Sequence, residues 1–412
     1  GYEDAAGNAG STDTTADSGS VTIDYTAPTV NSIAVTGVTN GQYGNSGTYT
    51  VIVTASEALS AAPTLTLAGG SVGSGTGSSS DTVWTYTFTP TDADESITID
   101  VDSGDISDPA GNPNTATPTQ FAFTHDQTAP TLTIAMSTDG NTGFAKTGNT
   151  ITLTITASES VTGLACTIDG ETATMGGSGT SWTAALEISG DETAGAATFS
   201  CGSHSDAAGN AGATDTTADS GAVTIDYTAP TLTIAMSTSG NTGYAKSGDT
   251  ITLTITASES VTGLTCTIDG ETATMGGSGT SWTAALTISG DETEGATTFS
   301  CGSHSDAAGN AGATDTTANS GAVTIDYTVA APSEATAAST PTTDTTPDVV
   351  ISVGEVGTIA VGGTTGCGLS SSSTMASGSN TLTLTTNGDK AYVCTVTFTD
   401  SAGNTASALS LT

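Results

Sequence analysis

Two stretches of this chain are near copies of each other, and this repeat constrains the fold more than any other feature. Shifting the sequence by 100 residues superimposes residues 131–228 on 231–328 with only nine differences, among them Phe144/Tyr244 and Glu187/Thr287. A segment that is copied whole is a structural unit, and about 100 residues are enough to bury a core. The chain of 412 residues therefore predicts a tandem array of separate domains.

Each copy ends in the same arrangement: an acidic loop SDAAGN, a polar spacer and the segment VTIDYTAP. The arrangement stands at Ser205–Asn210 with Val223–Pro230, and looser acidic loops occur at Asp108–Asn112 and Asp400–Asn404. The chain also begins inside such a copy, at Asp4–Asn8. We therefore expect a segment of a longer protein. Residues 1–27 of this chain hold only the last loop and strand of a domain, which are too short to bury a core.

Alternating apolar and polar residues mark short strands throughout the chain. Ile151–Thr156 is an example, with Ile151, Leu153 and Ile155 on one face. Several short strands separated by glycine turns, with no helical period, predict a two-sheet β-sandwich. In one copy we expect strands at residues 131–136, 150–157, 164–168, 171–175, 181–188, 196–203 and 222–227.

The copies divide the chain into five parts. These are 1–27, the C-terminal fragment of a repeat; 28–126, a divergent repeat without cysteine; the twin repeats 127–227 and 228–327; and 328–412, a divergent and shorter repeat. The last repeat begins with residues 329–339, which we expect to form a longer and looser linker than the others.

The charge excludes several classes of partner. The net charge is −39, with three lysines and no arginine, so the chain repels phosphate backbones and lacks the basic residues that anionic membranes attract. No stretch approaches the roughly 20 apolar residues of a membrane span. Of the 42 acidic residues 29 are aspartate, which forms turns and binds Ca²⁺. Charge that simply keeps a long array in solution explains the same composition.

Catalytic signatures are missing from the sequence. It holds three histidines, no Gly-x-Ser-x-Gly elbow and no metal-binding histidine pair. Carboxylate pairs such as Asp191-Glu192 lie in glycine-rich turns of a domain too small for a deep cleft. We expect no enzymatic activity.

The recurring motifs resemble those of a known family. The DxAGN loop, the aspartate that ends the last strand and the following TAP are similar to the bacterial Ig-like repeats of large secreted adhesins and surface proteins. Ala157–Glu159 followed by Val161, and Ala145–Thr150, match the same pattern. The resemblance covers essentially the whole chain. It implies Ig-like β-sandwiches in an extended rod, located outside the cell or on its surface.

The six cysteines occur as two in each of the last three repeats. The first of each pair falls on the third expected strand and the second on the sixth, and these strands are neighbours in one sheet of an Ig-type sandwich. We therefore predict disulfides within repeats, with free buried thiols as the alternative. The expected pairs are Cys166 with Cys201, Cys266 with Cys301, and Cys367 with Cys394.

Ig-type topology also brings acidic residues together where one repeat leads into the next. Asp226 ends one repeat and should meet Glu259, Asp306 and Asn310 of the following repeat. Hard oxygen ligands on loops suit Ca²⁺, whereas hydrogen bonding within the turn is the alternative role for the Asp and Asn side chains. The corresponding candidate ligands are Asp24, Glu57, Asp108 and Asn112; Asp126, Glu159, Asp206 and Asn210; and Asp326, Glu355, Asp400 and Asn404.

Two functions are compatible with these features. The first is a structural, non-catalytic stalk or fibre of a surface adhesin, stiffened by Ca²⁺ and made of this chain with neighbouring repeats or further copies of itself. The second is a binding module, in which the divergent repeat 28–126 or 328–412 recognises a glycan or a protein. The near identity of the twin repeats favours the first, because copies of this kind are typical of spacers.

Overall fold

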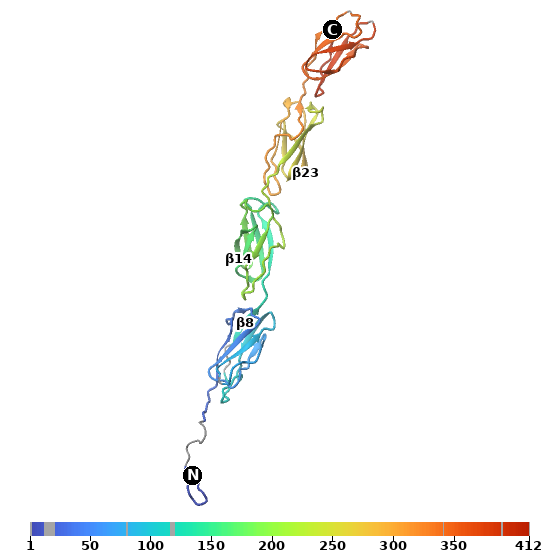
Figure 1. Ribbon diagram of the computed structural model, residues 1–412. Coiled ribbons are helices and arrows are strands. Elements are labelled where there is room, and N and C mark those ends of the chain that lie inside the picture. Colours follow the sequence, from blue (N-terminus) through green and yellow to red (C-terminus); the bar gives the residue numbers. More distant parts are fainter. Residues whose placement is uncertain are drawn as a thin grey trace. The chain divides into compact units, whose positions relative to one another are not determined.

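The computed structural model describes residues 2–11, 21–79, 81–115, 120–340, 342–388 and 390–411. Within these residues the chain consists of strands and loops with no helix, which confirms the all-β prediction (Figure 1). None of these residues forms a helix long and apolar enough to cross a membrane. Packing divides the chain into two compact units. The first comprises Gly1–Ser137, Thr150–Glu187 and Ala197–Ala222, and the second comprises Thr138–Asn149, Ile188–Ala196 and Val223–Thr412.

Repeat 28–126, in the first unit, forms two four-stranded sheets ordered β1-β3-β6-β5 and β2-β8-β7-β4. Alternation directs one face of each strand inward, so that Val51, Val53, Phe88 and Ile97 are fully buried between the sheets. The strands are β1 (Val30–Val35), β2 (Tyr43–Gly44), β3 (Tyr49–Ala55), β4 (Thr66–Ala68), β5 (Ser71–Val72), β6 (Val83–Thr89), β7 (Asp94–Asp100) and β8 (Phe121–Asp126).

The first unit also contains most of the strands of repeat 127–227. Two three-stranded sheets, β14-β11-β9 and β13-β12-β16, use the strands that the alternating pattern predicted. These are β9 (Leu132–Thr138), β11 (Thr150–Val161), β12 (Ala165–Ile168), β13 (Glu171–Thr172), β14 (Thr174–Glu187) and β16 (Phe199–Gly202). The long strand β14 covers the end of the predicted strand 171–175 and all but the last residue of the predicted strand 181–188.

The second unit contains all the strands of the twin repeat 228–327. Its sheets β18-β20-β23, β22-β21-β25 and β19-β26-β24 surround a core that includes Ile234, Ile251, Leu253 and Ile325. The strands are β18 (Leu232–Thr238), β19 (Tyr244–Ala245), β20 (Thr250–Val261), β21 (Thr265–Ile268), β22 (Glu271–Thr272), β23 (Thr274–Thr287), β24 (Gly295–Ala296), β25 (Phe299–Gly302) and β26 (Thr324–Ile325).

A parallel pair that the sequence analysis did not predict closes the twin repeats. In repeat 228–327 it joins β19 to β26. In repeat 127–227 it joins β10 (Phe144–Ala145) to β17 (Thr224–Ile225), which also pairs with β15 (Gly195–Ala196). Phe144–Ala145 and Tyr244–Ala245 stand alone and are too short to show a periodic pattern, whereas their partners lie within the predicted strand 222–227 and its twin.

The last repeat forms the sheets β27-β28-β32-β30 and β31-β29-β33-β34 around Val349, Ile351, Leu382 and Phe398. Part of the expected loose linker, residues 329–339, is the first strand of this repeat, because Ser333–Thr336 pairs with β28. The strands are β27 (Ser333–Thr336), β28 (Asp348–Val353), β29 (Gly357–Gly363), β30 (Gly368–Leu369), β31 (Thr374–Met375), β32 (Gly378–Thr385), β33 (Cys394–Asp400) and β34 (Leu409–Ser410).

All three predicted disulfides are confirmed, and the alternative of free thiols is excluded. The bonds are Cys166–Cys201, Cys266–Cys301 and Cys367–Cys394. In the twin repeats the two cysteines lie directly opposite each other on neighbouring antiparallel strands. Closing loops of 27 or 35 residues stabilises each repeat by about 3–4 kcal/mol in the chain-entropy model.

The N-terminal fragment agrees with the expectation that it cannot bury a core. Val21, Ile23 and Tyr25 are 89%, 71% and 87% exposed, whereas the corresponding Val223 and Ile225 are 2% and 1% exposed. Residues 12–20, which belong to the same predicted fragment, lie outside the residues that the structure describes.

A buried histidine occupies a position of the twin repeats that is apolar elsewhere. His304 precedes the acidic loop, and its carbonyl accepts the N–H of Gly312. The carbonyls of Ile106 and Phe398 accept the corresponding N–H in the other two repeats. His304 is 2% exposed, and among the described residues neither of its ring nitrogens has a hydrogen-bond partner. A buried polar group without a partner costs about 1–3 kcal/mol.

We therefore expect His304→Ile to stabilise repeat 228–327 by about 1 kcal/mol or more, because it removes the unpaired ring nitrogens and restores the side chain found at Ile106. Calorimetric unfolding of the full chain measures this as a rise in the melting temperature of one transition. The reverse change, Ile106→His, should lower the melting of repeat 28–126. An unchanged or lowered transition in His304→Ile would contradict this account of the site.

Candidate metal centres

Within the described residues, three carboxylates meet at four places, at the acidic loops that contain Asp108, Asp206, Asp306 and Asp400. In every group, one ligand atom from each residue lies within 4.8 Å of the other two. We call these groups the junction clusters. They are Asp24, Glu57 and Asp108; Asp126, Glu159 and Asp206; Asp226, Glu259 and Asp306; and Asp326, Glu355 and Asp400.

Each junction cluster combines the end of one repeat with two segments of the next. Asp226 follows β17, Glu259 lies near the end of β20, and Asp306 begins the acidic loop after β25. Asp306 is only 3% exposed, and its carboxylate accepts the N–H of Asn310 at 2.8 Å. Gly309 supplies the positive φ of 84° that this tight loop requires. The loop therefore fixes the direction of the Asp306 carboxylate before any ligand arrives.

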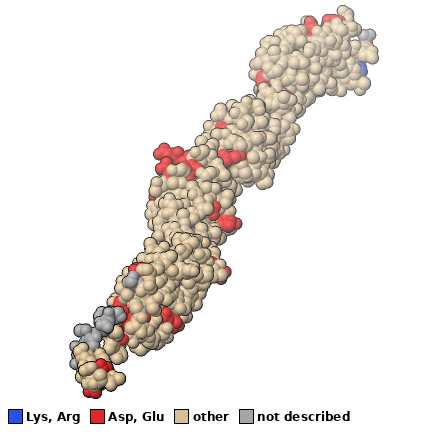
Figure 2. Space-filling model, turned by 60° about the horizontal axis from the view of Figure 1, so that its bottom comes forward, with Lys and Arg blue, Asp and Glu red and all other residues tan. Residues whose placement is uncertain are grey.

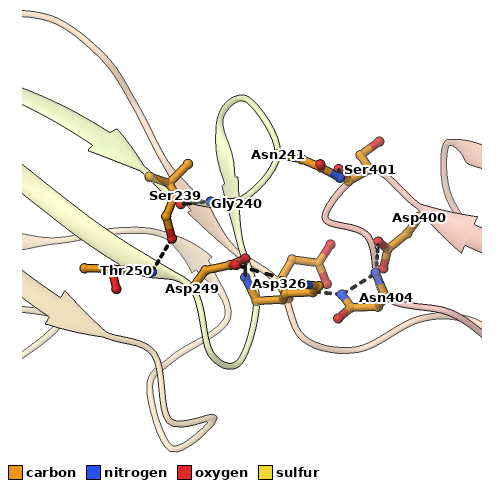
Figure 3. Close-up of polar contacts among 11 residues, drawn as sticks. Ser239, Gly240, Asn241, Asp249, Thr250, Asp326, Asp400, Ser401 and Asn404 are labelled. Carbon is orange, nitrogen blue, oxygen red and sulfur yellow. Dashed lines mark hydrogen bonds and ion pairs between the residues drawn. The ribbon is translucent and has the colours of Figure 1, made fainter.

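The four asparagines make the hydrogen bonds within the acidic loop that were the predicted alternative, and each adds a bond to the preceding repeat. The amide nitrogen of Asn404 donates to Asp400 at 2.9 Å and to the main-chain carbonyl of Asp326 at 2.9 Å, so Asn404 lies between the two acids (Figure 3). Asn112, Asn210 and Asn310 make the same pair of bonds. These bonds position the acidic loop against the preceding repeat and use the amide nitrogen, so the amide oxygens stay candidate ligands with the three carboxylates.

The electrostatics of the clusters are unfavourable for three negative charges. Burial, followed by the charges of Asp226 and Asp306, raises the pKa of Glu259. Burial and neighbouring acids also raise the pKa of Glu57 and Glu159. The ammonium of Lys246 pairs with Asp249 at 3.9 Å rather than with a cluster. Each cluster thus offers hard oxygen ligands with uncompensated charge, a chemistry that suits a divalent cation such as Ca²⁺.

A fourth carboxylate, missed in the sequence analysis, approaches two of the clusters. Burial, Asp400, Glu355 and then Glu294 raise the pKa of Asp326. Asp94 contributes in the same way to the raised pKa of Asp126, after burial and the charge of Asp206. Glu294 is one of the nine differences between the twin repeats, which is the signal that could have identified it.

A second set of polar contacts, also missed, joins consecutive repeats beside the clusters. Asn141 and Lys146 donate to the main-chain carbonyls of Ala307 and Gly309 in the next acidic loop. Asn241 makes the corresponding bond to the carbonyl of Ser401 at 2.9 Å (Figure 3). Lys146 and its twin Lys246 are two of the three lysines of the whole chain, and that placement was visible in the sequence.

The acidic residues are not spread evenly over the surface. On the face drawn in Figure 2, they lie in separate patches between broad areas without charge. A coat of charge that serves solubility alone would not need the equivalent three residues to converge at four copies of the loop. The convergence is therefore a property of the repeat and not of the composition.

Tandem Ig-like β-sandwiches are the class of structure that this fold defines. Residues 226–325 match the family model described as a bacterial Ig-like domain, which confirms over this range the resemblance found in the sequence. No curated protein matches the chain.

Solved structures similar to the chain include other tandem modules. The I9–I11 tandem of titin is 12% identical, with 72% of this chain and 100% of that chain covered and a TM-score of 0.26. The full ectodomain (Ig1–Ig3) of mouse nectin-like molecule 4 is 11% identical, with 70% and 98% covered and a TM-score of 0.26. The fibronectin(III)-like modules of Clostridium thermocellum CbhA are 13% identical, with 47% and 93% covered and a TM-score of 0.23.

We expect the carboxyl pKa of Glu259 to lie above its usual value in the cation-free protein, and Asp226→Asn to lower it by removing a neighbouring charge. Carbon-13 NMR titration of glutamate-labelled protein measures both. Because the folded pKa exceeds the unfolded one, the cation-free junction loses stability as pH rises from the unfolded pKa through the folded pKa. Asp191→Asn is the control and should leave Glu259 unchanged. Identical Glu259 titrations in wild type and Asp226→Asn would show that the carboxylates do not interact.

Proposed function

We propose that this chain is a structural, non-catalytic region of an extracellular or cell-surface adhesin, in which Ca²⁺ stiffens the joints between Ig-like repeats. The observation that carries the proposal is the recurrence of three carboxylates within 4.8 Å of one another at four equivalent positions. Neighbouring repeats of a longer chain or further copies of this one are the partners. The three disulfides support an oxidising location outside the cell.

The chain's own residues would make the joint rigid in a simple way. Asp226 belongs to the end of one repeat, whereas Glu259 and Asp306 belong to the next. A cation held by all three would resist bending, because bending moves Asp226 away from the other two ligands. Without a cation, repulsion between the carboxylates favours opening of the joint, while the cores and disulfides keep the sandwiches folded.

Calcium fits this set of ligands better than magnesium. The carboxylates come from three separate segments: an acidic loop, a strand end and a linker. No single rigid element holds them in the near-ideal octahedral arrangement that Mg²⁺ requires. Ca²⁺ accepts six to eight oxygens in flexible geometry and takes main-chain carbonyls and water as well as carboxylates. Extracellular modules bind Ca²⁺ with a Kd of about 10⁻⁴–10⁻³ M, the range we expect here.

Calcium should change the flexibility of the full chain without changing its fold. Small-angle scattering should show a more flexible particle after chelation, while circular dichroism stays the same. Calorimetry should detect Ca²⁺ uptake, and Asp226→Asn with Asp306→Asn should remove about one bound ion per chain.

The matched control for that double variant is Asp191→Asn with Asp291→Asn, which removes the same charge from exposed turns of the twin repeats. It should retain full Ca²⁺ uptake. The proposal would be wrong if calorimetry detected no heat of Ca²⁺ binding and scattering were identical with and without chelator. The acidic residues of the clusters would then serve only to form turns and to keep the chain soluble.

A cavity favours the last repeat as the site of a second candidate function, glycan or protein binding. The cavity has a volume of about 650 Å³ and is lined by Val349, Leu384 and Leu411 together with Asp344 and Tyr392. An aromatic ring, apolar side chains and a few polar groups are the usual composition of a ligand site. The described strands of this repeat pair only in antiparallel fashion and include no counterpart of the parallel pair β19–β26.

If the cavity binds glycans, the full chain should retain specific sugars on a glycan array, and Tyr392→Ala should abolish that retention by removing the aromatic ring of the cavity. The control is Tyr43→Ala, which removes a half-exposed tyrosine from repeat 28–126. An array without specific binding would exclude glycan binding by this cavity.

A further inference from the structure

The chain contains the dipeptide asparagine–glycine twice, and the surroundings of the two pairs differ. They are Asn40-Gly41 in repeat 28–126 and Asn387-Gly388 in the last repeat, and both asparagines are exposed. An asparagine followed by glycine is prone to deamidation, because a glycine without Cβ lets its main-chain nitrogen approach the side-chain carbonyl carbon of the asparagine. Hydrogen bonds that hold either group oppose this approach.

Asn40-Gly41 is held by the last strand of its repeat. The side-chain carbonyl of Asn40 accepts the N–H of Ala122 at 2.8 Å, and its amide nitrogen donates to the carbonyl of Gln120 at 3.4 Å. The N–H of Gly41 donates to the carbonyl of Ala122 at 2.7 Å. Both groups that would react are therefore tied to β8 and the residue before it, and an attack would have to break these bonds.

Asn387-Gly388 lacks this restraint. Among the described residues, neither the side-chain amide of Asn387 nor the N–H of Gly388 has a hydrogen-bond partner. Gly388 has a φ of 92°, and a Cβ built there would meet no atom within 4 Å. The turn thus leaves the nucleophilic nitrogen unbonded and surrounded by open space.

A tyrosine hydroxyl spans the same turn. The Tyr392 hydroxyl accepts the N–H of Asn387 at 2.6 Å and donates to the carbonyl of Gly388 at 3.2 Å. These bonds hold the first and last main-chain groups of the dipeptide and involve neither of the groups that would react. Tyr392 also lines the cavity of the last repeat, so the turn is connected to the rim of that cavity.

We propose that Asn387 is a site of spontaneous deamidation. The Gly388 nitrogen attacks Cγ of Asn387, so that a C–N bond forms, the bond from Cγ to the side-chain nitrogen breaks, and that nitrogen leaves as ammonia with the proton from Gly388. Water then opens the succinimide ring at either carbonyl, which gives aspartate or isoaspartate at position 387. The reaction needs only water, so it goes beyond the proposed function and does not depend on it.

Isoaspartate changes this turn more than aspartate does. In isoaspartate the main chain runs through the former side chain and is one carbon longer, whereas aspartate keeps the main chain and adds only a negative charge. The extra carbon lies between the Asn387 N–H and the Gly388 carbonyl, the two groups that the Tyr392 hydroxyl joins. The isoaspartate form therefore loses this pair of bonds and loosens Tyr392 at the rim of the cavity.

Peptide mapping by mass spectrometry of the full chain, incubated at mildly alkaline pH, tests the proposal. Asn387 should convert about tenfold faster than Asn40 or more, because attack at Asn40 first requires the loss of its hydrogen bonds. In denaturant with a reductant, where neither site is held, the two rates should become similar. Equal rates in the folded chain, or conversion of Asn387 only after unfolding, would overturn the proposal.

Two variants separate the reaction from its effect on the turn. Asn387→Gln is the matched control, because its longer side chain forms the ring far more slowly, and it should stay unmodified in the same incubation. Asn387→Asp carries the new charge on an unchanged main chain, so its last repeat should melt like that of the fresh wild type. The incubated wild type should melt lower as isoaspartate accumulates. Equal melting of the isoaspartate form and Asn387→Asp would overturn the effect assigned to Tyr392.

Discussion

Repulsion between carboxylates at the junction clusters is the interaction on which the rest of the chain depends. Three acids within 4.8 Å of one another oppose any contact between repeats unless a cation or a proton neutralises them. The chain supplies almost no cation of its own, with three lysines against 42 acidic residues. The sandwiches can hold these charges together because their apolar cores and disulfides keep them folded. The unfavourable electrostatic free energy then acts at the joints and not in the cores.

The sequence was sufficient to predict the sandwich, because its long strands have one buried and one exposed face. The alternation of Ile151, Leu153 and Ile155 required a strand, and the positions of Cys166 and Cys201 on neighbouring strands followed from the Ig-type order. The parallel pair of Phe144–Ala145 with Thr224–Ile225 could not be predicted in this way. It joins segments 80 residues apart over only two residues, so it depends on the closed fold and leaves no local pattern.

The candidate ligands were also visible, because the acidic residues recur with the repeat. The orientation of the asparagines was not, since the amide of Asn310 is directed by a main-chain carbonyl of the preceding repeat. Contacts such as Lys146 with Gly309 join residues 163 positions apart, and their partner atoms are main-chain carbonyls that no sequence pattern marks. The sequence thus identifies which charges meet, whereas the tertiary structure decides which polar groups hold them there.

The twin repeats show how such a chain can vary its joints without changing its domains. None of the nine positions that differ between the twins is buried in either copy, so the core, the disulfide and the junction acids are the same. Core substitutions cost stability through cavities or strain, whereas exposed positions tolerate change within about 0.5 kcal/mol. Variation between copies is therefore confined to surfaces and turns, and at one of these positions Glu294 accepts the N–H groups of Tyr327 and Thr328.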